Sequence, residues 1–282
     1  MQTPENDLIH SGIAGLDAEL GQRRSALDGP RHIAPAWHTV VLIVGILALS
    51  FAGSKGQTVQ HRGGNRLLTY GTTAALELGM LGWVALGLWL RKTPFRSLFG
   101  ALKGSPRGFA LDVGIALVFW IGSLMVLGSL GILWTTVEFA VAHGGEKLHA
   151  GQKLEPSESQ QQTVRALEQL APENGKEIAW WVLLCFTAGF VEEAVFRGYL
   201  QQQFTAWGRG NAAAGVVFSA LMFGAAHGYQ GVRNMVLLGV FGVLFSLLAI
   251  FRRNLRPGIL AHGGHDLIAG LALAYLRTHR LI

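Results

Sequence analysis

Charged residues are scarce in this chain of 282 residues, where Asp, Glu, Lys and Arg together make up only 14%. An ordinary soluble domain carries about 25%. Half of the residues are hydrophobic, and the mean hydropathy is +0.36. Such a chain cannot cover a water-facing surface with polar groups, but it can cover a lipid-facing one. The composition therefore predicts a multi-pass membrane protein.

Cysteine is almost absent, since Cys185 is the only one and lies in an apolar segment. An intrachain disulfide and a zinc site built from Cys thiolates are therefore excluded. An early apolar run is also missing, because residues 1–31 are polar. We therefore expect no cleavable signal peptide, and we expect the first hydrophobic segment to be an anchor.

The net charge of +6 comes without zinc knuckles or basic-aromatic repeats, so nucleic acid is not an expected partner. The basic residues instead concentrate in short stretches between apolar segments, such as 91–107. Loops and helix ends beside anionic headgroups favour such residues, which makes membrane lipid the expected partner. The distribution of Lys and Arg slightly favours a cytosolic N-terminus.

Seven apolar segments are candidates for membrane-spanning helices. They are residues 37–53, 67–90, 109–142, 178–200, 212–227, 235–251 and 258–276. A spanning helix needs about 17–25 predominantly apolar residues. The predicted fold is therefore all-α, a polytopic transmembrane helix bundle of about seven or eight spans. The first segment is short for a span, and the third is long enough to be tilted or to continue past the membrane.

The pattern divides the chain into four regions. Residues 1–36 are expected to form a polar N-terminal arm, and residues 37–142 the N-terminal transmembrane helices. Residues 143–177 are rich in Glu, Gln, Lys and Pro and predict an extramembrane loop, with a short amphipathic helix around 160–170. Residues 178–282 are expected to form a second transmembrane region.

Ionisable residues inside apolar segments are costly, so each such cluster is a hypothesis of a functional site. The second transmembrane region holds three clusters, which are Glu192-Glu193-Ala-Val-Phe196-Arg197, Phe223-Gly-Ala-Ala-His227 and His262-Gly-Gly-His265-Asp266. In the first, Glu193 and Arg197 are four residues apart and share a helix face, so we expect them to pair. Glu192 points about 100° away and is left for another partner.

The other two clusters also place ionisable residues beside small ones on apolar helices. His262 and Asp266 also share a helix face, and Gly263 and Gly264 between them are expected to clear space for a substrate rather than for packing. His227 ends a helix of small residues that should let neighbouring helices approach closely. Taken singly, the clusters have structural alternatives, namely a helix-end salt bridge, an interfacial histidine and an inter-helix hydrogen-bond network.

Taken together, carboxylates and imidazoles from three or four helices can converge in the core of a bundle. A carboxylate there could take a proton from water. The imidazoles could orient that water, stabilise an oxyanion or hold a metal ion.

The three clusters resemble the motifs of a known family. Glu192-Glu193-Ala-Val-Phe196-Arg197-Gly198 resembles the EExxxR-G motif of the type II CAAX prenyl proteases, also called CPBP for CAAX proteases and bacteriocin-processing enzymes. Phe223-x-x-x-His227 resembles the FxxxH motif, and His262-x-x-x-Asp266 resembles HxxxN/D, with Pro257 five residues before the histidine. The similarity covers about residues 178–276, and the motifs stand in the family's order.

The resemblance implies that residues 178–282 form the catalytic transmembrane core of an intramembrane endopeptidase. Its substrates would be membrane-associated proteins or peptides, including prenylated CAAX tails if the host is a eukaryote. The resemblance makes Glu192 the general base that activates water, together with His227, with Glu193 and Arg197 completing the motif. It assigns binding of the oxyanion or of the substrate carbonyl to His262 and Asp266, the last at a position where Asn is common.

The resemblance leaves the cofactor open between none and zinc, because the family is interpreted either as a glutamate-dependent hydrolase or as a metalloprotease. Zinc would have Glu192, His227, His262 and Asp266 as candidate ligands. The chain contains no HExxH motif, and we favour chemistry without a metal.

Two other function classes remain alternatives, namely a non-enzymatic immunity or scaffold protein of the same fold and a proton-coupled transporter. A scaffold does not need two carboxylates in lipid, and a transporter of the common type would show paired repeats, which we do not find. Four further polar residues, His265, Glu77, Asp112 and Glu138, are interpreted as packing, helix–helix hydrogen bonding or membrane-boundary groups. The spans rich in glycine and alanine suggest a bacterial cell membrane rather than the endoplasmic reticulum.

Overall fold

The computed structural model describes residues 32–57, 65–101, 104–142 and 170–279, together with the separate positions 157, 160, 161 and 164. Helices dominate this part of the chain. They are α2 (Ala36–Gln57), α3 (Arg66–Leu90), η1 (Phe95–Phe99), α4 (Pro106–Ala142), α6 (Gly175–Glu192), η2 (Glu193–Leu200), α7 (Gln201–Trp207), α8 (Ala212–Ala226), η3 (Gly228–Gln230), α9 (Val232–Arg252) and α10 (Arg256–Thr278). Most of the N-terminal arm and of the predicted loop with its amphipathic helix lies outside the described residues.

All seven predicted apolar segments are helical, which confirms an all-α membrane bundle. Among the described residues, six helical stretches are long and apolar enough to cross a membrane: α2, α3, α4, the continuous stretch α6–η2–α7, α9 and α10. Helix α8 has only 15 residues. It is about 22 Å long at a rise of 1.5 Å per residue, short of the roughly 30 Å hydrocarbon core. The segment predicted as the fifth span is therefore a shorter apolar helix.

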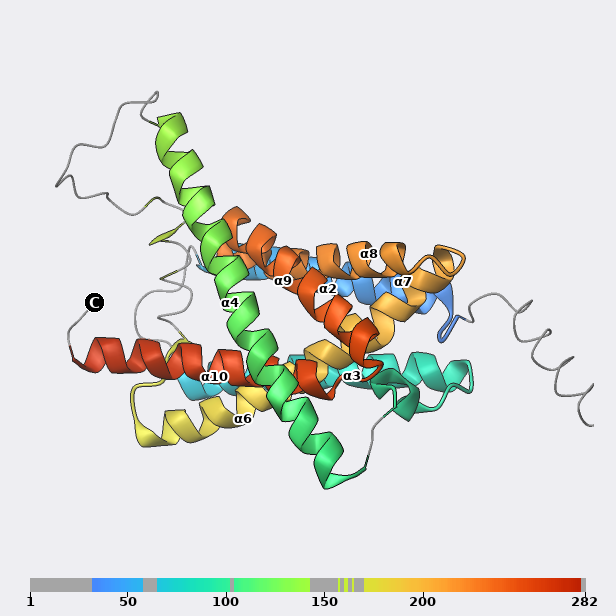
Figure 1. Cartoon of the computed structure of the whole chain (residues 1–282). Coiled ribbons are helices and arrows are strands. Elements are labelled where there is room, and N and C mark those ends of the chain that lie inside the picture. Colours follow the sequence, from blue (N-terminus) through green and yellow to red (C-terminus); the bar gives the residue numbers. More distant parts are fainter. Residues whose placement is uncertain are drawn as a thin grey trace, which may run out of the picture.

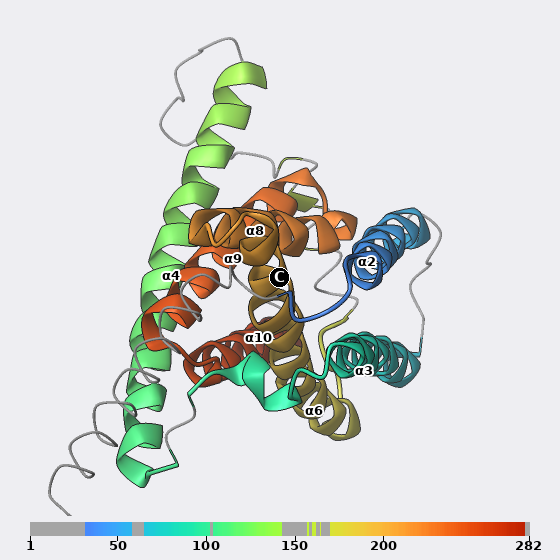
Figure 2. The same ribbon diagram turned by 90° about the vertical axis from the view of Figure 1, so that its right-hand side faces the viewer.

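Helix α6 packs against α3 on one side and α10 on the other. Helices α2 and α3 lie at one side of the bundle and α4 at the opposite side, while α8 and α9 pack together (Figure 2). Helix α4 crosses its neighbours obliquely, and one end reaches beyond them (Figure 1). Its 37 residues span about 55 Å, longer than the roughly 30 Å hydrocarbon core, so a tilt or an extension past the membrane stays the prediction for this helix.

The distribution of polar groups is the reverse of that in a soluble domain. Large apolar side chains face outward, among them Phe251 and Val141, each 79% exposed. The interior instead holds Glu193, Arg197 and Gln203, none more than 3% exposed. A lipid environment explains the apolar exterior. Buried polar groups are costly in such a protein, so they indicate a functional site or specific pairing between helices.

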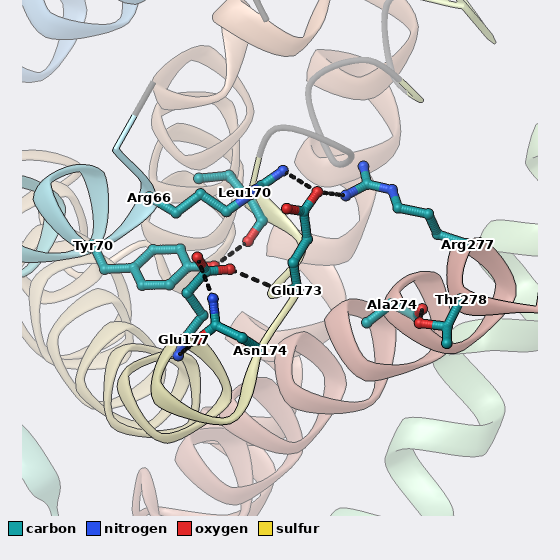
Figure 3. Close-up of polar contacts among 9 residues, drawn as sticks. All are labelled: Arg66, Tyr70, Leu170, Glu173, Asn174, Glu177, Ala274, Arg277 and Thr278. Atoms are coloured by element: carbon teal, nitrogen blue, oxygen red, sulfur yellow. Dashed lines mark hydrogen bonds and ion pairs between the residues drawn. The ribbon is translucent and has the colours of Figure 1, made fainter. Parts of the chain in front are cut away.

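One end of the bundle is held by a carboxylate shared between two helices (Figure 3). Glu173 Oε1 accepts hydrogen bonds from Arg66 at the start of α3, at 2.6 Å, and from Arg277 at the end of α10, at 2.7 Å. Beside it, the Tyr70 hydroxyl donates to the Leu170 carbonyl at 2.6 Å. These bonds join α3 and α10 to the segment that leads into α6.

The opposite end has a second shared carboxylate, this one buried. Asp112 in α4 accepts from Arg252 at 2.9 Å and from Arg256 at 3.1 Å, and its side chain is only 3% exposed. The pair fixes α4 to the turn between α9 and α10. The interpretation of Asp112 as a helix–helix hydrogen-bonding group is therefore confirmed.

The stretch α6–η2–α7 contains a π-helix, η2, whose eight residues are all buried. The Gln201 backbone N–H bonds to the Phe196 carbonyl, five residues earlier. The Phe196 carbonyl accepts from the Ser219 hydroxyl of α8 at 2.6 Å, and the Gly198 carbonyl accepts from the Gln202 side chain at 2.6 Å. Such insertions are frequent at functional sites, and this one begins at Glu193.

Candidate active site

A buried ion pair forms the floor of the site. Arg197 Nη1 lies 3.0 Å from Glu193 Oε1, and both side chains are at most 1% exposed. The predicted pairing of these residues is therefore present. Removing two charges from water costs several kcal/mol each, so a pair this deep stays charged only with close partners on every side.

Aromatic rings supply part of that environment for Arg197. Its guanidinium carbon lies 4.2 Å from the ring centroid of Phe223 and 5.0 Å from that of Phe245. A cation over an aromatic face gains about 2 kcal/mol or more when desolvated. The aromatic residue of the Phe223–His227 motif thus supports the arginine of the first motif, a relationship that spacing along the chain did not reveal.

His262 of α10 connects the Glu193–Arg197 ion pair to the other acidic residues. Its Nδ1 lies 3.2 Å from Glu193 Oε1, and its Nε2 lies 3.7 Å from both Glu192 Oε2 and Asp266 Oδ2. An ionised carboxylate can only accept a hydrogen bond, so Nδ1 carries the proton toward Glu193. The atom that faces Glu192 and Asp266 is then Nε2, oriented by the bond on the opposite side of the ring.

Glu192 differs from Glu193 because one of its carboxylate oxygens has no hydrogen-bond partner in the described part of the chain. Its Oε2 is buried and accepts no hydrogen bond from any described residue, although the side chain is 17% exposed. Glu192 thus keeps one carboxylate oxygen outside the Glu193–Arg197 pair, as expected for a residue left for another partner. A buried acceptor without a protein partner normally binds an ordered water.

The close approach of α6 and α10 depends on glycine. A Cβ atom at Gly189 would lie 2.7 Å from the Gly263 backbone nitrogen, and one at Gly258 would lie 3.0 Å from Glu193 Oε2. The expectation that Gly263 makes room for a substrate is therefore wrong, because Gly263 packs against α6. A Cβ at Gly264, by contrast, would meet no atom within 4 Å.

His227 stands apart from the cluster. It ends α8, its Nδ1 lies 2.8 Å from the Phe223 carbonyl, and its ring packs on Phe223 at 4.9 Å between centroids. It forms no ion pair with any carboxylate in the described part of the chain. Phe223 separates it from His262, whose ring centroid lies 5.9 Å from that of Phe223. The structure thus brings together Glu192, Glu193, Arg197, His262 and Asp266, with His227 at the edge.

His265 faces away from the cluster. Its Nδ1 accepts from the Trp120 indole of α4 at 3.3 Å, and its ring packs against Phe241 of α9. The interpretation of His265 as a packing residue agrees with these contacts.

Two residues near the site were not assigned to it from the sequence. The Tyr229 hydroxyl in η3 accepts from Gln230 at 2.9 Å. Burial, together with the charges of Glu192 and Asp266, raises the pKa of Tyr229 to about 12, so its hydroxyl stays neutral. The second residue is Glu77 of α3, on which the charges of Glu192, Asp266 and His262 act. Its position in an apolar segment was the one available signal.

Zinc is the metal that the sequence resemblance leaves open. The four candidate ligands, Glu192, His227, His262 and Asp266, do not converge, because the ring of His227 is directed at the Phe223 carbonyl. Among the described residues, no group of three or more His, Cys, Asp and Glu side chains is arranged to hold a metal ion. The residues present therefore do not fit a zinc site, and we derive no step through a metal.

The fold and the site define an integral membrane protein with a carboxylate–imidazole cluster buried in a helix bundle. Comparison with family models adds that residues 174–268 match the model of the type II CAAX prenyl endopeptidase Rce1-like family. The matched segment contains all three motifs, so the comparison agrees with the resemblance that they carry. Searches of the curated proteins and of the solved structures returned no match.

Proposed function

We propose that the protein is an intramembrane endopeptidase that hydrolyses peptide bonds of membrane-associated proteins or peptides with a water molecule activated by Glu192. One observation carries the proposal. Glu192 Oε2 is buried without a hydrogen-bond partner among the described residues, 3.7 Å from His262 Nε2. That gap separates an acceptor and an imidazole nitrogen that one water molecule can contact together.

In the proposed reaction, the Glu192 carboxylate takes a proton from this water as its oxygen attacks the scissile carbonyl carbon. In this step His262 carries a proton on Nε2 and donates it in a hydrogen bond to the substrate carbonyl and the developing oxyanion, while Asp266, 3.7 Å from that nitrogen, helps to hold the charged ring. Collapse of the tetrahedral intermediate breaks the carbon–nitrogen bond, and the amine leaves with one proton. The water is thereby divided, with its hydroxyl on the new carboxyl group and its proton on the amine.

Glu193 and Arg197 have a supporting role in this proposal. Glu193 Oε1 holds His262 through Nδ1 at 3.2 Å and is itself held by Arg197 at 3.0 Å. The imidazole is therefore oriented before the substrate binds, which reduces the reorganisation needed in the transition state. His227 and Tyr229 lie at the edge of the cluster, where a substrate backbone would enter.

The test is cleavage by the full-length protein, purified and reconstituted into phospholipid vesicles. Membrane-anchored peptides, some of them prenylated CAAX peptides, are incubated with the wild type, with Glu192→Gln and with Glu173→Gln. Mass spectrometry then identifies the products and their rates. Glu192→Gln should lower the rate about 10²- to 10⁴-fold, the usual contribution of a general base. Glu173→Gln, which removes a carboxylate at the far end of the bundle, should cleave at the wild-type rate.

The same experiment separates the alternatives. Wild-type protein that is folded but leaves every peptide intact would contradict the proposal and favour a scaffold or immunity role. Glu192→Gln protein that cleaves as fast as the wild type would remove Glu192 from the mechanism. Proton flux across the vesicle membrane that depends on Glu192, without any cleavage, would favour the transporter.

A further inference from the structure

A fourth carboxyl group lies beside the cluster, contributed by the half of the chain outside the matched domain. Glu77, in the middle of α3, is only 6% exposed. Its Oε2 atom is buried and has no hydrogen-bond partner among the described residues. Such a group is expensive within a membrane protein, so its presence calls for a function or a compensating partner.

Several neighbours place Glu77 at the site. Helix α3 packs directly against α6 and η2, the elements that carry Glu192 and Glu193. The charges of Glu192 and Asp266 act on Glu77. Glu77 therefore lies on a helix that packs against the elements that carry Glu192 and Glu193.

The charges of this region do not balance if every acid is ionised. Four carboxyl groups, on Glu77, Glu192, Glu193 and Asp266, share the positive charges available from Arg197 and His262. Arg197 is already bound to Glu193 at 3.0 Å. Uncompensated carboxylates in a low-dielectric interior take up protons rather than remain charged. A cluster of this composition therefore holds protons that it can donate.

We propose that Glu77 is the acid that protonates the departing amine in the peptide hydrolysis proposed above, on which this inference rests. Glu192 takes a proton from water as the carbon–oxygen bond forms. When the carbon–nitrogen bond breaks, the Glu77 carboxyl group gives its proton to the amine nitrogen and becomes a carboxylate. The proton held by Glu192 then returns to Glu77 through water, which restores both groups.

Two carboxyl groups with separate tasks suit this site. Glu192 lies 3.7 Å from His262 Nε2, at the position proposed for the attacking water. Glu77 Oε2 is buried without a hydrogen-bond partner, and none of the ion pairs found among the described residues includes Glu77. Environments that differ in this way commonly divide one pair of carboxyl groups into base and acid.

The test compares leaving groups. The full-length protein in phospholipid vesicles is assayed with a membrane-anchored peptide that the wild type cleaves and with the 4-nitrophenyl ester of the same acyl segment. An amine must be protonated to leave, whereas a 4-nitrophenolate leaves without a proton. Glu77→Gln should therefore lower peptide cleavage about 10²- to 10⁴-fold while hydrolysing the ester within a few-fold of the wild type. Glu192→Gln should lose both activities.

Equal losses on the peptide and the ester would overturn the assignment and leave Glu77 a packing residue, as would a peptide rate unchanged from the wild type. Should Glu77→Gln fail to fold, Glu77→Asp keeps the acid on a shorter side chain and should show the larger loss on the peptide. Failure of the proposed function is distinct, because the wild type would then cleave no peptide.

Discussion

Glu193 Oε1 is shared between His262 Nδ1, at 3.2 Å, and Arg197 Nη1, at 3.0 Å. One oxygen atom thus joins the histidine of α10 to the arginine of η2. Glu193 Oε1 already has two partners, which suits it to hold His262 rather than to accept a proton from water, whereas the adjacent Glu192 keeps Oε2 without a hydrogen-bond partner among the described residues. The adjacent acids therefore divide into a structural carboxylate and a reactive one.

Replacing Glu193 by Gln should damage folding as well as activity. Arg197 would be left as a buried cation without its counter-charge, which typically costs about 3–5 kcal/mol. The double variant Glu193→Gln/Arg197→Met removes both charges and should recover much of that loss, because the surroundings of Arg197 are aromatic. Thermal unfolding in detergent measures the stability of both proteins. A Glu193→Gln protein as stable as the wild type would show that the ion pair does not stabilise the bundle.

The packing of α6 on α10 offers a matched pair of glycine substitutions. Gly189→Ala places a methyl group 2.7 Å from the Gly263 nitrogen, whereas Gly264→Ala meets nothing within 4 Å. Forced overpacking usually costs about 1–3 kcal/mol. Gly189→Ala should also lower peptide cleavage at least tenfold, because it separates the helices that carry Glu192 and His262. Gly264→Ala should retain both properties, and equal behaviour of the two variants in unfolding and cleavage assays would contradict this account.

Two carboxylates in the structure each bridge two arginines, and they differ in burial. Asp112 is 3% exposed, whereas Glu173 is 47% exposed. Asp112→Asn should lower the free energy of unfolding by about 3 kcal/mol or more, since two arginines lose a buried partner. Glu173→Gln should cost no more than about 1 kcal/mol. Chemical denaturation in detergent micelles measures the free energy of unfolding of both variants. A larger loss of stability from Glu173→Gln would contradict the prediction that Asp112 contributes more.

Asp266→Asn tests what the last motif position requires. Asp266 Oδ2 lies 3.7 Å from His262 Nε2, and its side chain is 32% exposed. An amide of the same shape can still accept through its oxygen and can donate to an oxyanion, so the variant should cleave peptides within about tenfold of the wild type. Asp266→Leu provides neither contact and should lose about 10²-fold or more. If Asn proved as damaging as Leu in the vesicle assay, the negative charge itself would be required.

The sequence predicted those contacts that lie within one helix. Spacing of four residues on apolar helices was sufficient to expect the Glu193–Arg197 pair and the shared face of His262 and Asp266. The contact between Glu193 and His262 joins residues 69 positions apart and depends on how α6 and α10 cross. No local rule gives that crossing. The role of Gly263 was misjudged for the same reason, because only the neighbouring helix shows what the missing side chain makes room for.

Glu77 and Asp112 illustrate the limit for the N-terminal half. Both are isolated acids in apolar helices, and the sequence gives the same structural interpretation to each. The structure separates them, since Asp112 has two arginine partners and Glu77 has the acidic cluster as its neighbour. The difference lies in which helix stands opposite, and that information is held in the packing of α3 and α4.

The π-helix η2 also sets the directions in which side chains point before and after it along the continuous helix α6–η2–α7. Glu193 faces α10 at its beginning, while Tyr199 near its end bonds to His38 and Thr39 of α2, each at 2.9 Å. Deleting one residue from the wide turns would restore ordinary α-helical winding and rotate the two faces against each other by about 100°. Helix α2 and the acidic cluster could then no longer pack against the same continuous helix, so the position of α2 relative to Glu193 depends on these eight residues.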